Sequence, residues 1–327
     1  MKCTNKIGVA MLLLVCVMTA GCGKRAPELE RTYDIYRTAV AAGAANTQSA
    51  GRGGFFAEEL CVAPDVELGT GETTSQVADG AGLFNLATKS VTYEKNIYKK
   101  LYPASTTKIL TAYLVLKYCD DLGTIATVSE NAVNQAADSS VCGLKAGDII
   151  SVRDLLYGLM LRSGNDAAIV LAEQLSGSVE QFAELMNQEA LALGATQSHF
   201  VNPNGLPAEG HYTSVYDLYL LFKEALKNER FVELISATSY TVSYQDAAGN
   251  TVEKEWENTN QYFTGYATPP EGITVIGGKT GTTGEAGYCL VLYAKNQKGE
   301  PIISIVLKAD GKANLYLLMN EMLNGYA

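Results

Sequence analysis

Ser105 and Lys108 stand three residues apart in the stretch YPASTTKILTA and could form a nucleophile and its base. Pro103 disfavours helical angles in the residue before it, and the run at 109–118 is apolar nearly all round, which predicts a buried helix. Ser105 is therefore expected at the start of this helix, beside unpaired backbone N–H groups and the positive end of the dipole. Lys108 shares that helical turn, and partial desolvation would leave it a neutral amine able to take the serine proton.

A Ser-x-x-Lys pattern alone is common by chance, so its meaning depends on two further motifs. Ser163-Gly-Asn165 lies between two runs with helical spacing, where a loop can expose both side chains. Lys279-Thr-Gly281 ends a predicted strand and is followed by Thr282. Each motif is ordinary loop or strand chemistry by itself. All three, in this order and on these elements, indicate one catalytic constellation.

The composition excludes several classes of function. The chain has 327 residues, 47% of them hydrophobic, and a formal charge of −10, with no long basic run. This balance argues against nucleic acid as a partner. Only two histidines are present, and no Cys or His pair has ligand spacing, so we expect no metal. No glycine-rich phosphate loop precedes a helix, and we expect no cofactor.

The N-terminal residues predict export. Lys2 and Lys6 precede an apolar run at 7–20 that is too short to span a bilayer comfortably, which is typical of a signal peptide. The run ends in Thr-Ala-Gly-Cys22, which resembles the cleavage box of bacterial lipoproteins, although leucine is usual where Thr19 stands. We expect a signal peptide over 1–21 and lipidation of Cys22, with cleavage after Ala20 as the alternative.

Residues 22–54 are rich in small residues and predict a flexible tether, so the folded domain is expected over 55–327. Residues 81–98 predict two strands with a turn at 88–89. Helical patterns fill most of a lobe at about 109–235 and include the runs 151–161, 166–175, 179–193 and 214–227. Ser151 is a predicted N-cap, Gly194 a predicted helix stop, and Asn202-Pro-Asn-Gly205 a predicted turn.

The period changes to two after Ser236. The runs 238–245 and 251–258 predict a hairpin, and 273–280, 287–294 and 301–309 predict three more strands before a closing helix at 314–323. Strands at both ends with helices between them predict an α/β (α+β) fold, in which helices back an antiparallel sheet and form a separate lobe.

The three motifs resemble those of the active-site serine penicillin-recognising enzymes, most closely the D-alanyl-D-alanine carboxypeptidases, which are low-molecular-weight penicillin-binding proteins. The resemblance extends through YPASTTKILTA, LMLRSGNDAA, FVNPNGL, HYTSVYDL and GGKTGTTGEAGYCL, over roughly residues 80–310. It implies a β-lactamase-like fold with a five-stranded antiparallel sheet. It also implies removal of the terminal D-alanine from peptidoglycan stem peptides, and β-lactams as covalent inhibitors.

The resemblance also implies a role for each motif residue. Ser105 would attack the carbonyl between the last two D-alanines, Lys108 would accept its proton, and Ser163 would protonate the departing amine. Asn165 would orient Lys108 and the substrate amide.

The third motif would bind the substrate. Lys279 would keep Lys108 neutral by repulsion and attract the terminal carboxylate, which the hydroxyls of Thr280 and Thr282 would also bind. Gly281 would let the substrate lie close to the strand edge as an added strand. Backbone N–H groups of Ser105 and Thr282 would form the oxyanion hole.

Two departures from the family pattern shape further expectations. Family members often carry an arginine near the last strand for the carboxylate, but no arginine follows Arg230, so Lys308 or Lys312 would serve. The C-terminal β-domain with a membrane-binding tail is also expected to be missing. If Cys22 is lipidated, a membrane anchor lies at the other end, and we expect the protein at the outer face of the cytoplasmic membrane or in the cell wall.

Three alternatives share some of these residues. A transpeptidase differs only in its acyl acceptor, and a serine β-lactamase needs a deacylating base. Glu184 could be considered for that base, but its run predicts a solvated helix face. A non-catalytic sensor or cell-wall-binding lipoprotein is disfavoured by the intact Ser105 and Lys108 pair. His199 and His211 are expected to make structural hydrogen bonds.

Four cysteines remain after export: Cys61, Cys119, Cys142 and Cys289. They allow three full pairings, among which the sequence does not choose. Cys119 and Cys289 lie in apolar runs and are also consistent with core thiols.

Overall fold

The computed structural model describes residues 58–64, 68–69 and 74–325. The chain divides into two units, Met1–Phe55 and Phe56–Ala327, and everything described below belongs to the second. The predicted signal peptide, Cys22 and the predicted tether lie outside the described residues.

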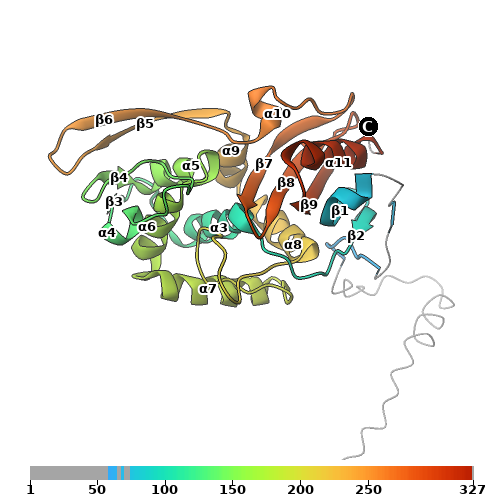
Figure 1. The fold of residues 1–327 in the computed structure, drawn as a ribbon, viewed down its shortest axis with the longest axis horizontal. Helices are drawn as coiled ribbons and strands as arrows, with labels where there is room; N and C mark the ends of the chain where they lie inside the picture. The colour runs from blue at the N-terminus through green and yellow to red at the C-terminus, as the bar shows by residue number, and fades with distance from the viewer. Residues whose placement is uncertain (1–57, 65–67, 70–73, 326–327) are drawn as a thin grey trace, which may run out of the picture. The chain divides into compact units, whose positions relative to one another are not determined.

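The larger sheet has five antiparallel strands in the order β2-β1-β9-β8-β7 (Figure 1). Its strands are β1 (Ala78–Asn85), β2 (Ser90–Lys95), β7 (Thr274–Thr283), β8 (Gly287–Lys295) and β9 (Pro301–Ala309). The prediction of a five-stranded antiparallel sheet is therefore confirmed, including the two strands and turn at its N-terminal side. β7 lies at one edge of the sheet, where its outer side is free of a neighbouring strand among the described residues.

Both faces of this sheet are covered, because the central strand β9 is apolar in both directions. Ile302 and Val306 face a core shared with α11 (Lys312–Asn324), whereas Ile303 and Ile305 belong to the core on the opposite face. The opposite face packs against α8 (Val215–Ala225) and the helical lobe. The predicted closing helix is thus confirmed as a layer on the sheet.

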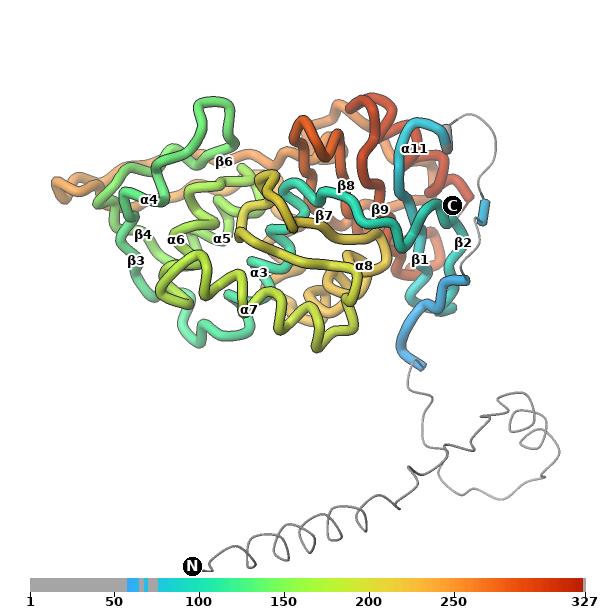
Figure 2. The backbone as a smooth tube through the Cα atoms, turned by 60° about the horizontal axis from the view of Figure 1, so that its bottom comes forward, coloured from blue at the N-terminus to red at the C-terminus, as the bar shows by residue number. Residues whose placement is uncertain are grey.

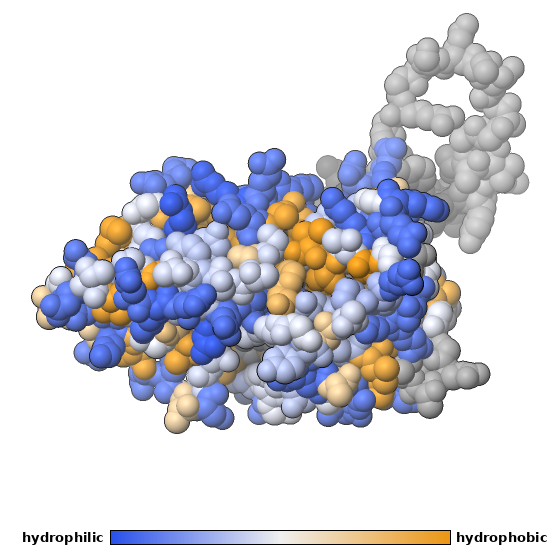
Figure 3. All heavy atoms as spheres, turned by 90° about the horizontal axis from the view of Figure 1, so that it is seen from above, coloured by the Kyte–Doolittle hydropathy of each residue, from blue (hydrophilic) through white to orange (hydrophobic). Residues whose placement is uncertain are grey.

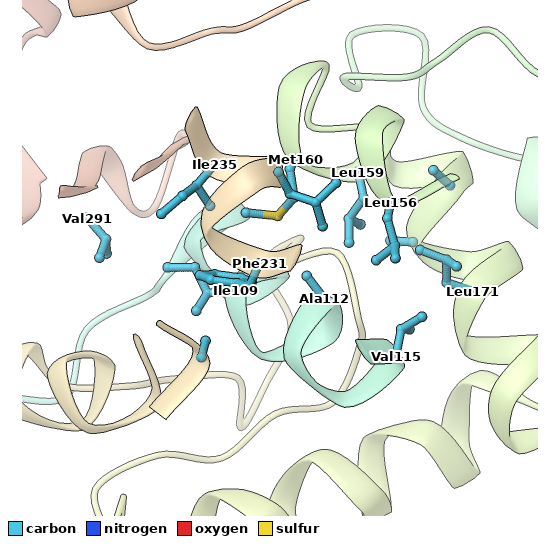
Figure 4. Close-up of a cluster of buried hydrophobic side chains, with 14 of the residues drawn as sticks. Ile109, Ala112, Val115, Leu156, Leu159, Met160, Leu171, Phe231, Ile235 and Val291 are labelled. Carbon is cyan, nitrogen blue, oxygen red and sulfur yellow. The ribbon is translucent and has the colours of Figure 1, made fainter. Parts of the chain in front are cut away.

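The helical lobe is built around α3, the helix predicted after the Ser105 motif. Figure 4 shows Ile109 and Val115 of α3 among side chains from α5, α6, α9 and β8. Because α3 is surrounded, nearly every position on it must be apolar, as the sequence pattern indicated. The helices are α3 (Lys108–Tyr118), α4 (Glu130–Val133), α5 (Val152–Leu161), α6 (Asn165–Ser176), α7 (Val179–Ala192) and α9 (Glu229–Ser236).

Local signals set several helix ends as predicted. The hydroxyl of Ser151 accepts a hydrogen bond from Asp154 N and caps α5, while Gly194 follows α7 with φ +82°. Ser214 likewise caps α8 through Asp217 N. These contacts satisfy backbone N–H groups that a helix terminus leaves unpaired.

A second sheet was not predicted. It has four antiparallel strands in the order β3-β4-β5-β6, namely β3 (Ile125–Thr127), β4 (Ile149–Ser151), β5 (Ser239–Gln245) and β6 (Thr251–Glu257). The predicted hairpin forms β5 and β6, and it runs along the helical lobe beside α5 (Figures 1 and 2). β3 and β4 have three residues each, too few to show a period in the sequence.

None of the helices in the described part of the chain has the length and hydropathy needed to cross a lipid bilayer. On the face shown in Figure 3, hydrophobic residues gather in separate patches between hydrophilic ones. Isolated patches of this kind are normal for a folded domain.

Candidate active site

Ser105 and Lys108 meet where a short 3-10 helix, η2 (Ala104–Thr107), continues into α3. Lys108 Nζ lies 2.9 Å from Ser105 Oγ. The lysine is fully buried, whereas Ser105 is half-buried and lines a cleft. The predicted adjacency of these two side chains on one helical turn is therefore observed.

Two carbonyl oxygens fix the orientation of the Lys108 amine. Its Nζ donates to Asn165 Oδ1 at 2.8 Å and to the backbone oxygen of Asn204 at 2.6 Å. A neutral amine has two N–H bonds and one lone pair. With both N–H bonds directed at carbonyls, the lone pair is left for the hydroxyl of Ser105. This geometry is what a lysine needs to act as a base toward a serine.

The electrostatics favour that neutral form. Burial lowers the pKa of Lys108 well below its usual value, and repulsion from Lys279 lowers it further. Burial also lowers the pKa of Lys279, to about 7. Lys279 Nζ donates to the backbone oxygen of Thr280 at 2.9 Å. The expected repulsion between the two lysines is present, but loss of water contact is the larger effect.

The turn at 202–205 packs against the backbone of the residue that precedes Ser105. Asn202 Oδ1 accepts from Gly205 N at 2.7 Å, which closes the predicted turn. Gly205 has φ +85°, and a Cβ atom there would overlap the backbone oxygen of Ala104. Ala104 itself has φ +47°, an uncommon conformation for a residue with a side chain. The turn therefore holds the residue before Ser105 in a strained conformation.

The edge strand β7 comes unusually close to the backbone of Ser105. A Cβ atom on Gly281 would lie 2.9 Å from Ser105 N and 3.1 Å from Thr106 N. Glycine is therefore required here for space. This close approach puts Thr282, the next residue on β7, beside the start of η2. Gly281 and Thr282 line one cleft together with Ser105.

The loop between α5 and α6 carries the second motif. Ser163 is buried with φ +59°, and Asn165 is the first residue of α6. Asn165 N donates to the backbone oxygen of Ser140 at 2.8 Å, which ties this loop to the segment 140–144. The buried carboxylate of Asp166 accepts from the backbone N–H groups of Cys142, Gly143 and Leu144 and so secures the same segment.

These elements enclose a cleft of about 210 Å³. The predicted residues that line it are Ser105, Ser163, Thr280, Gly281 and Thr282, whereas Lys108, Asn165 and Lys279 lie buried behind its surface. Of the two lysines considered for the carboxylate, Lys312 lines the cleft, while Lys308 instead forms an ion pair with Asp79 at 3.2 Å.

Sequence reasoning missed several residues of this cleft. Ser140, Thr259, Gln261, Tyr288 and Tyr316 also line it. Gln261 begins the short helix α10 (Gln261–Thr264), and its backbone N–H donates to the hydroxyl of Tyr316 at 2.8 Å. Tyr288 lies within the stretch GGKTGTTGEAGYCL but outside its Lys-Thr-Gly motif, and the other four residues belong to none of the three motifs. Only the tertiary fold brings them to the cleft.

The other residues considered earlier have structural surroundings. His211 is buried, its Nε2 lies 3.0 Å from Thr107 Oγ1, and its Nδ1 accepts from Val201 N, so the prediction of structural hydrogen bonds is confirmed. His199 Nδ1 lies 2.7 Å from the backbone oxygen of Gly210. Glu184 is exposed on α7, as its helix pattern indicated, and does not line the cleft.

All four cysteines in the described residues are free thiols. Cys289 is fully buried, as expected for a core thiol, and Cys119 is only partly buried. The described part of the chain contains no group of three or more His, Cys, Asp or Glu side chains able to hold a metal ion.

Comparison with known proteins gives a consistent match. The family described as D-alanyl-D-alanine carboxypeptidase matches residues 70–311. The D-alanyl-D-alanine carboxypeptidase DacF of Bacillus subtilis is 39% identical over 234 residues, which are 69% of this chain and 57% of that protein. A D-alanyl-D-alanine carboxypeptidase of Streptomyces sp. strain K15 is 33% identical over 240 residues, covering 70% of this chain and 80% of that one.

A similar solved structure is the DD-transpeptidase of Streptomyces K15, with a TM-score of 0.70 and 31% identity. The match covers 76% of this chain and 96% of that chain. This chain spans 57% to 60% of the length of the first three curated relatives it matches.

Proposed function

The chain belongs to the D-alanyl-D-alanine carboxypeptidase family, and on this premise we propose that it removes the terminal D-alanine from peptidoglycan stem peptides. The reaction would proceed through an acyl-enzyme on Ser105. One observation carries the proposal: the buried amine of Lys108 has both N–H bonds directed at carbonyl oxygens and lies 2.9 Å from the serine hydroxyl.

Acylation follows from this arrangement. Ser105 Oγ attacks the carbonyl carbon between the last two D-alanines while its proton moves to Lys108 Nζ. The negative charge that develops on the carbonyl oxygen is stabilised by the backbone N–H groups of Ser105 and Thr282, which the close approach of Gly281 brings together. Ser163 then passes a proton to the nitrogen of the departing D-alanine, and the C–N bond breaks. Water hydrolyses the resulting ester.

The terminal carboxylate of the substrate selects the position of cleavage. Thr280 of β7 and Lys312 at the start of α11 line the cleft, and Lys279 lies buried behind its surface. We place the carboxylate there, with Lys312 in the position that an arginine serves in other members of the family. A higher KM of a Lys312→Gln variant, with kcat little changed, would support this role, and an unchanged KM would contradict it.

The substrate would lie on β7 as an additional strand. β7 is an edge strand, so its outer backbone groups are available to pair with an extended peptide. Gly281 offers no side chain that would hold the peptide away from the strand.

A transpeptidase is the second candidate, because the similar solved structure from Streptomyces K15 is named a DD-transpeptidase. Its acyl-enzyme would react with an amine in place of water. A β-lactamase is less well supported, since Glu184 does not line the cleft. Adding a D-amino acid to the assay distinguishes the first two: exchange of the terminal residue in excess of hydrolysis favours the transpeptidase.

We also propose that residues 1–21 are a signal peptide, that Cys22 is lipidated and that 22–54 tether a catalytic domain over 55–327 at the outer face of the membrane. The cleavage box around Cys22 supports this proposal. Labelled fatty acid should enter the wild-type chain and not a Cys22→Ala variant. Equal labelling of both would refute lipidation at this position.

The central test measures D-alanine released from a peptide that ends in D-Ala-D-Ala. Wild-type protein should release D-alanine, and a Ser105→Ala variant should release none above the uncatalysed rate. The same wild-type sample treated with a β-lactam should gain the mass of the drug on the peptide that contains Ser105. Equal rates for both proteins, or a mass gain elsewhere, would overturn the assignment.

A further inference from the structure

A cavity on the helical lobe shares no lining residue with the active-site cleft. It has a volume of about 380 Å³ and is lined by residues of α3, α5, α9 and β5. Leu116, its residue from α3, lies roughly two helical turns, or about 12 Å, from Lys108 along that helix. The volume is in the range of small-molecule sites, so the chemistry of the lining decides what the cavity can hold.

The residues that line this cavity on α5 and on α9 stand at positions i, i+3 and i+4, which share one face of a helix. Each face contributes an arginine and a leucine. The residues are Arg153, Leu156 and Tyr157 of α5, and Arg230, Glu233 and Leu234 of α9. Both leucines are buried, whereas both arginines are exposed. The cavity is therefore apolar inside and cationic at its mouth, and we call it the lobe pocket.

The two arginines of the lobe pocket have no ionic partner among the described residues. That part of the chain contains three arginines, of which Arg153 and Arg230 are two, and neither of them forms an ion pair there. Glu233 is the one acidic residue in the lining, so the lobe pocket is net positive although the whole chain carries −10. A guanidinium favours carboxylate and phosphate groups, because it can donate two parallel N–H bonds to them.

Two tyrosines engage the neighbouring carboxylates. The rings of Tyr157 and Tyr240 stack with their centroids 3.8 Å apart. The hydroxyl of Tyr157 donates to Glu233 Oε1 at 2.9 Å, and that of Tyr240 donates to Asp154 Oδ1 at 2.6 Å. Both carboxylates thus have neutral partners, and both rings line the lobe pocket with apolar surface. This arrangement exists without a ligand, so an incoming anion finds the arginines available.

The volume of the lobe pocket limits the size of its ligand. A water-sized group occupies about 30 Å³, so 380 Å³ has room for roughly twelve non-hydrogen atoms. An anionic group on an unbranched chain of about ten carbon atoms meets this limit. Its charged group would stay at the exposed arginines, and its chain would leave water between the leucines. Neither end then pays the penalty of an unpaired buried charge.

We propose that the lobe pocket binds a single-chain amphiphilic anion, namely an aliphatic chain that ends in a carboxylate or phosphate group. Arg153 and Arg230 bind the charged group, and the chain lies against the leucines of α3, α5 and α9. This binding does not depend on the reaction at Ser105, so either proposal can fail without the other.

Calorimetry with decanoate, decyl phosphate and decyltrimethylammonium tests the choice of charge, with each probe kept below the concentration at which it forms micelles. Two exposed charge contacts are each worth up to about fivefold, so at least one anion should bind about tenfold more tightly than the cation with the same chain. The tighter of the two anions identifies the preferred charged group. Equal affinity for all three probes, or no detectable binding, would overturn the proposal.

A series of chain lengths tests the apolar part of the lobe pocket. Each methylene group that leaves water contributes up to about fourfold in affinity. For the tighter-binding anion, affinity should therefore rise by about tenfold or more from the hexyl to the decyl chain. It should then level off at the dodecyl chain, which exceeds the available volume. An equally steep rise between the decyl and dodecyl chains would indicate adsorption to an open surface and contradict the proposal.

Substitutions assign the binding to residues. A variant that combines Arg153→Gln with Arg230→Gln should bind the anion about tenfold more weakly. Arg162→Gln is the matched control, because this exposed arginine does not line the lobe pocket, and it should keep the wild-type affinity. Lys312→Gln should also keep it, which separates the lobe pocket from the active-site cleft. Thermal unfolding without ligand shows whether each variant is folded. Unchanged affinity in the double variant, or lost affinity in Lys312→Gln, would refute the assignment.

Discussion

Replacing Gly281 by alanine tests the geometry on which the proposed oxyanion hole depends. The added Cβ atom would lie 2.9 Å from Ser105 N, 3.1 Å from the Cβ of Ala104 and 3.1 Å from Thr106 N, whereas ordinary contacts lie at 3.4–4 Å. Backbone atoms cannot rotate away as a side chain does. β7 and the start of η2 must therefore separate by roughly half an ångström or more, which weakens at least one of the two hydrogen bonds to the oxyanion.

The size of the effect follows from the loss of that hydrogen bond. Removal of one oxyanion donor costs about 100-fold to 1,000-fold in kcat, and partial displacement should cost on the order of 100-fold. D-alanine release from a D-Ala-D-Ala peptide measures it, with thermal unfolding recorded in parallel. Gly325→Ala is the matched control, since its Cβ would meet only Met322 O, at 3.6 Å. Gly281→Ala activity within about threefold of wild type would refute this account of the site.

Three further predictions concern the residues behind the cleft. Gly205→Ala should destabilise the fold by more than about 2 kcal/mol in denaturant unfolding, because the new Cβ overlaps the backbone oxygen of Ala104 and φ is +85°. kcat/KM should fall as pH is lowered, because Lys108 takes up a proton. In Lys279→Gln that fall should move to higher pH, because removing the neighbouring cation raises the pKa of Lys108; an unmoved profile would contradict the coupling. The pKa of His211 is lowered from 6.5 to about 4 by burial and by His199, so the unfolded chain binds more protons between these values. Stability should therefore fall by up to about 3 kcal/mol as pH drops through this window, and a His211→Gln variant should lose most of that dependence.

Strong local signals explain what the sequence could predict. The closing helix, the hairpin and the strands of the larger sheet each have a long run with one clear period. The three motifs could be recognised in the sequence because the functional side chains of each motif lie within a few residues of one another, as Ser105 and Lys108 do. Resemblance to a family supplied the roles, since spacing alone does not distinguish Ser163 from any loop serine.

What could not be predicted depends on contacts between distant segments. β3 and β4 have three residues each, and only pairing with each other and with β5 makes them strands. The acceptor for Lys108 at Asn204 is a backbone oxygen, which carries no side-chain signature. Gln261 and Tyr316 reach the cleft because α10 and α11 pack together, and their sequence neighbourhoods are those of ordinary helix starts and faces.

The chain as a whole is acidic, yet its site depends on two buried lysines, Lys108 and Lys279. A carboxylate in contact with Lys108 would raise its pKa and remove the base. Asp166 is near enough to act in that direction, but its oxygens are occupied by backbone N–H groups of 142–144. Within the described part of the chain, the hydrogen bonds of the Lys108 amine instead join it to neutral oxygens, those of Ser105, Asn165 and Asn204. Neither Lys108 nor Lys279 forms an ion pair with a described residue, so in the proposed reaction the substrate carboxylate would be the anion beside them. Asn165→Asp tests this reasoning, because it puts a charge where the amide now accepts: acylation at neutral pH should fall steeply and recover in part as pH rises.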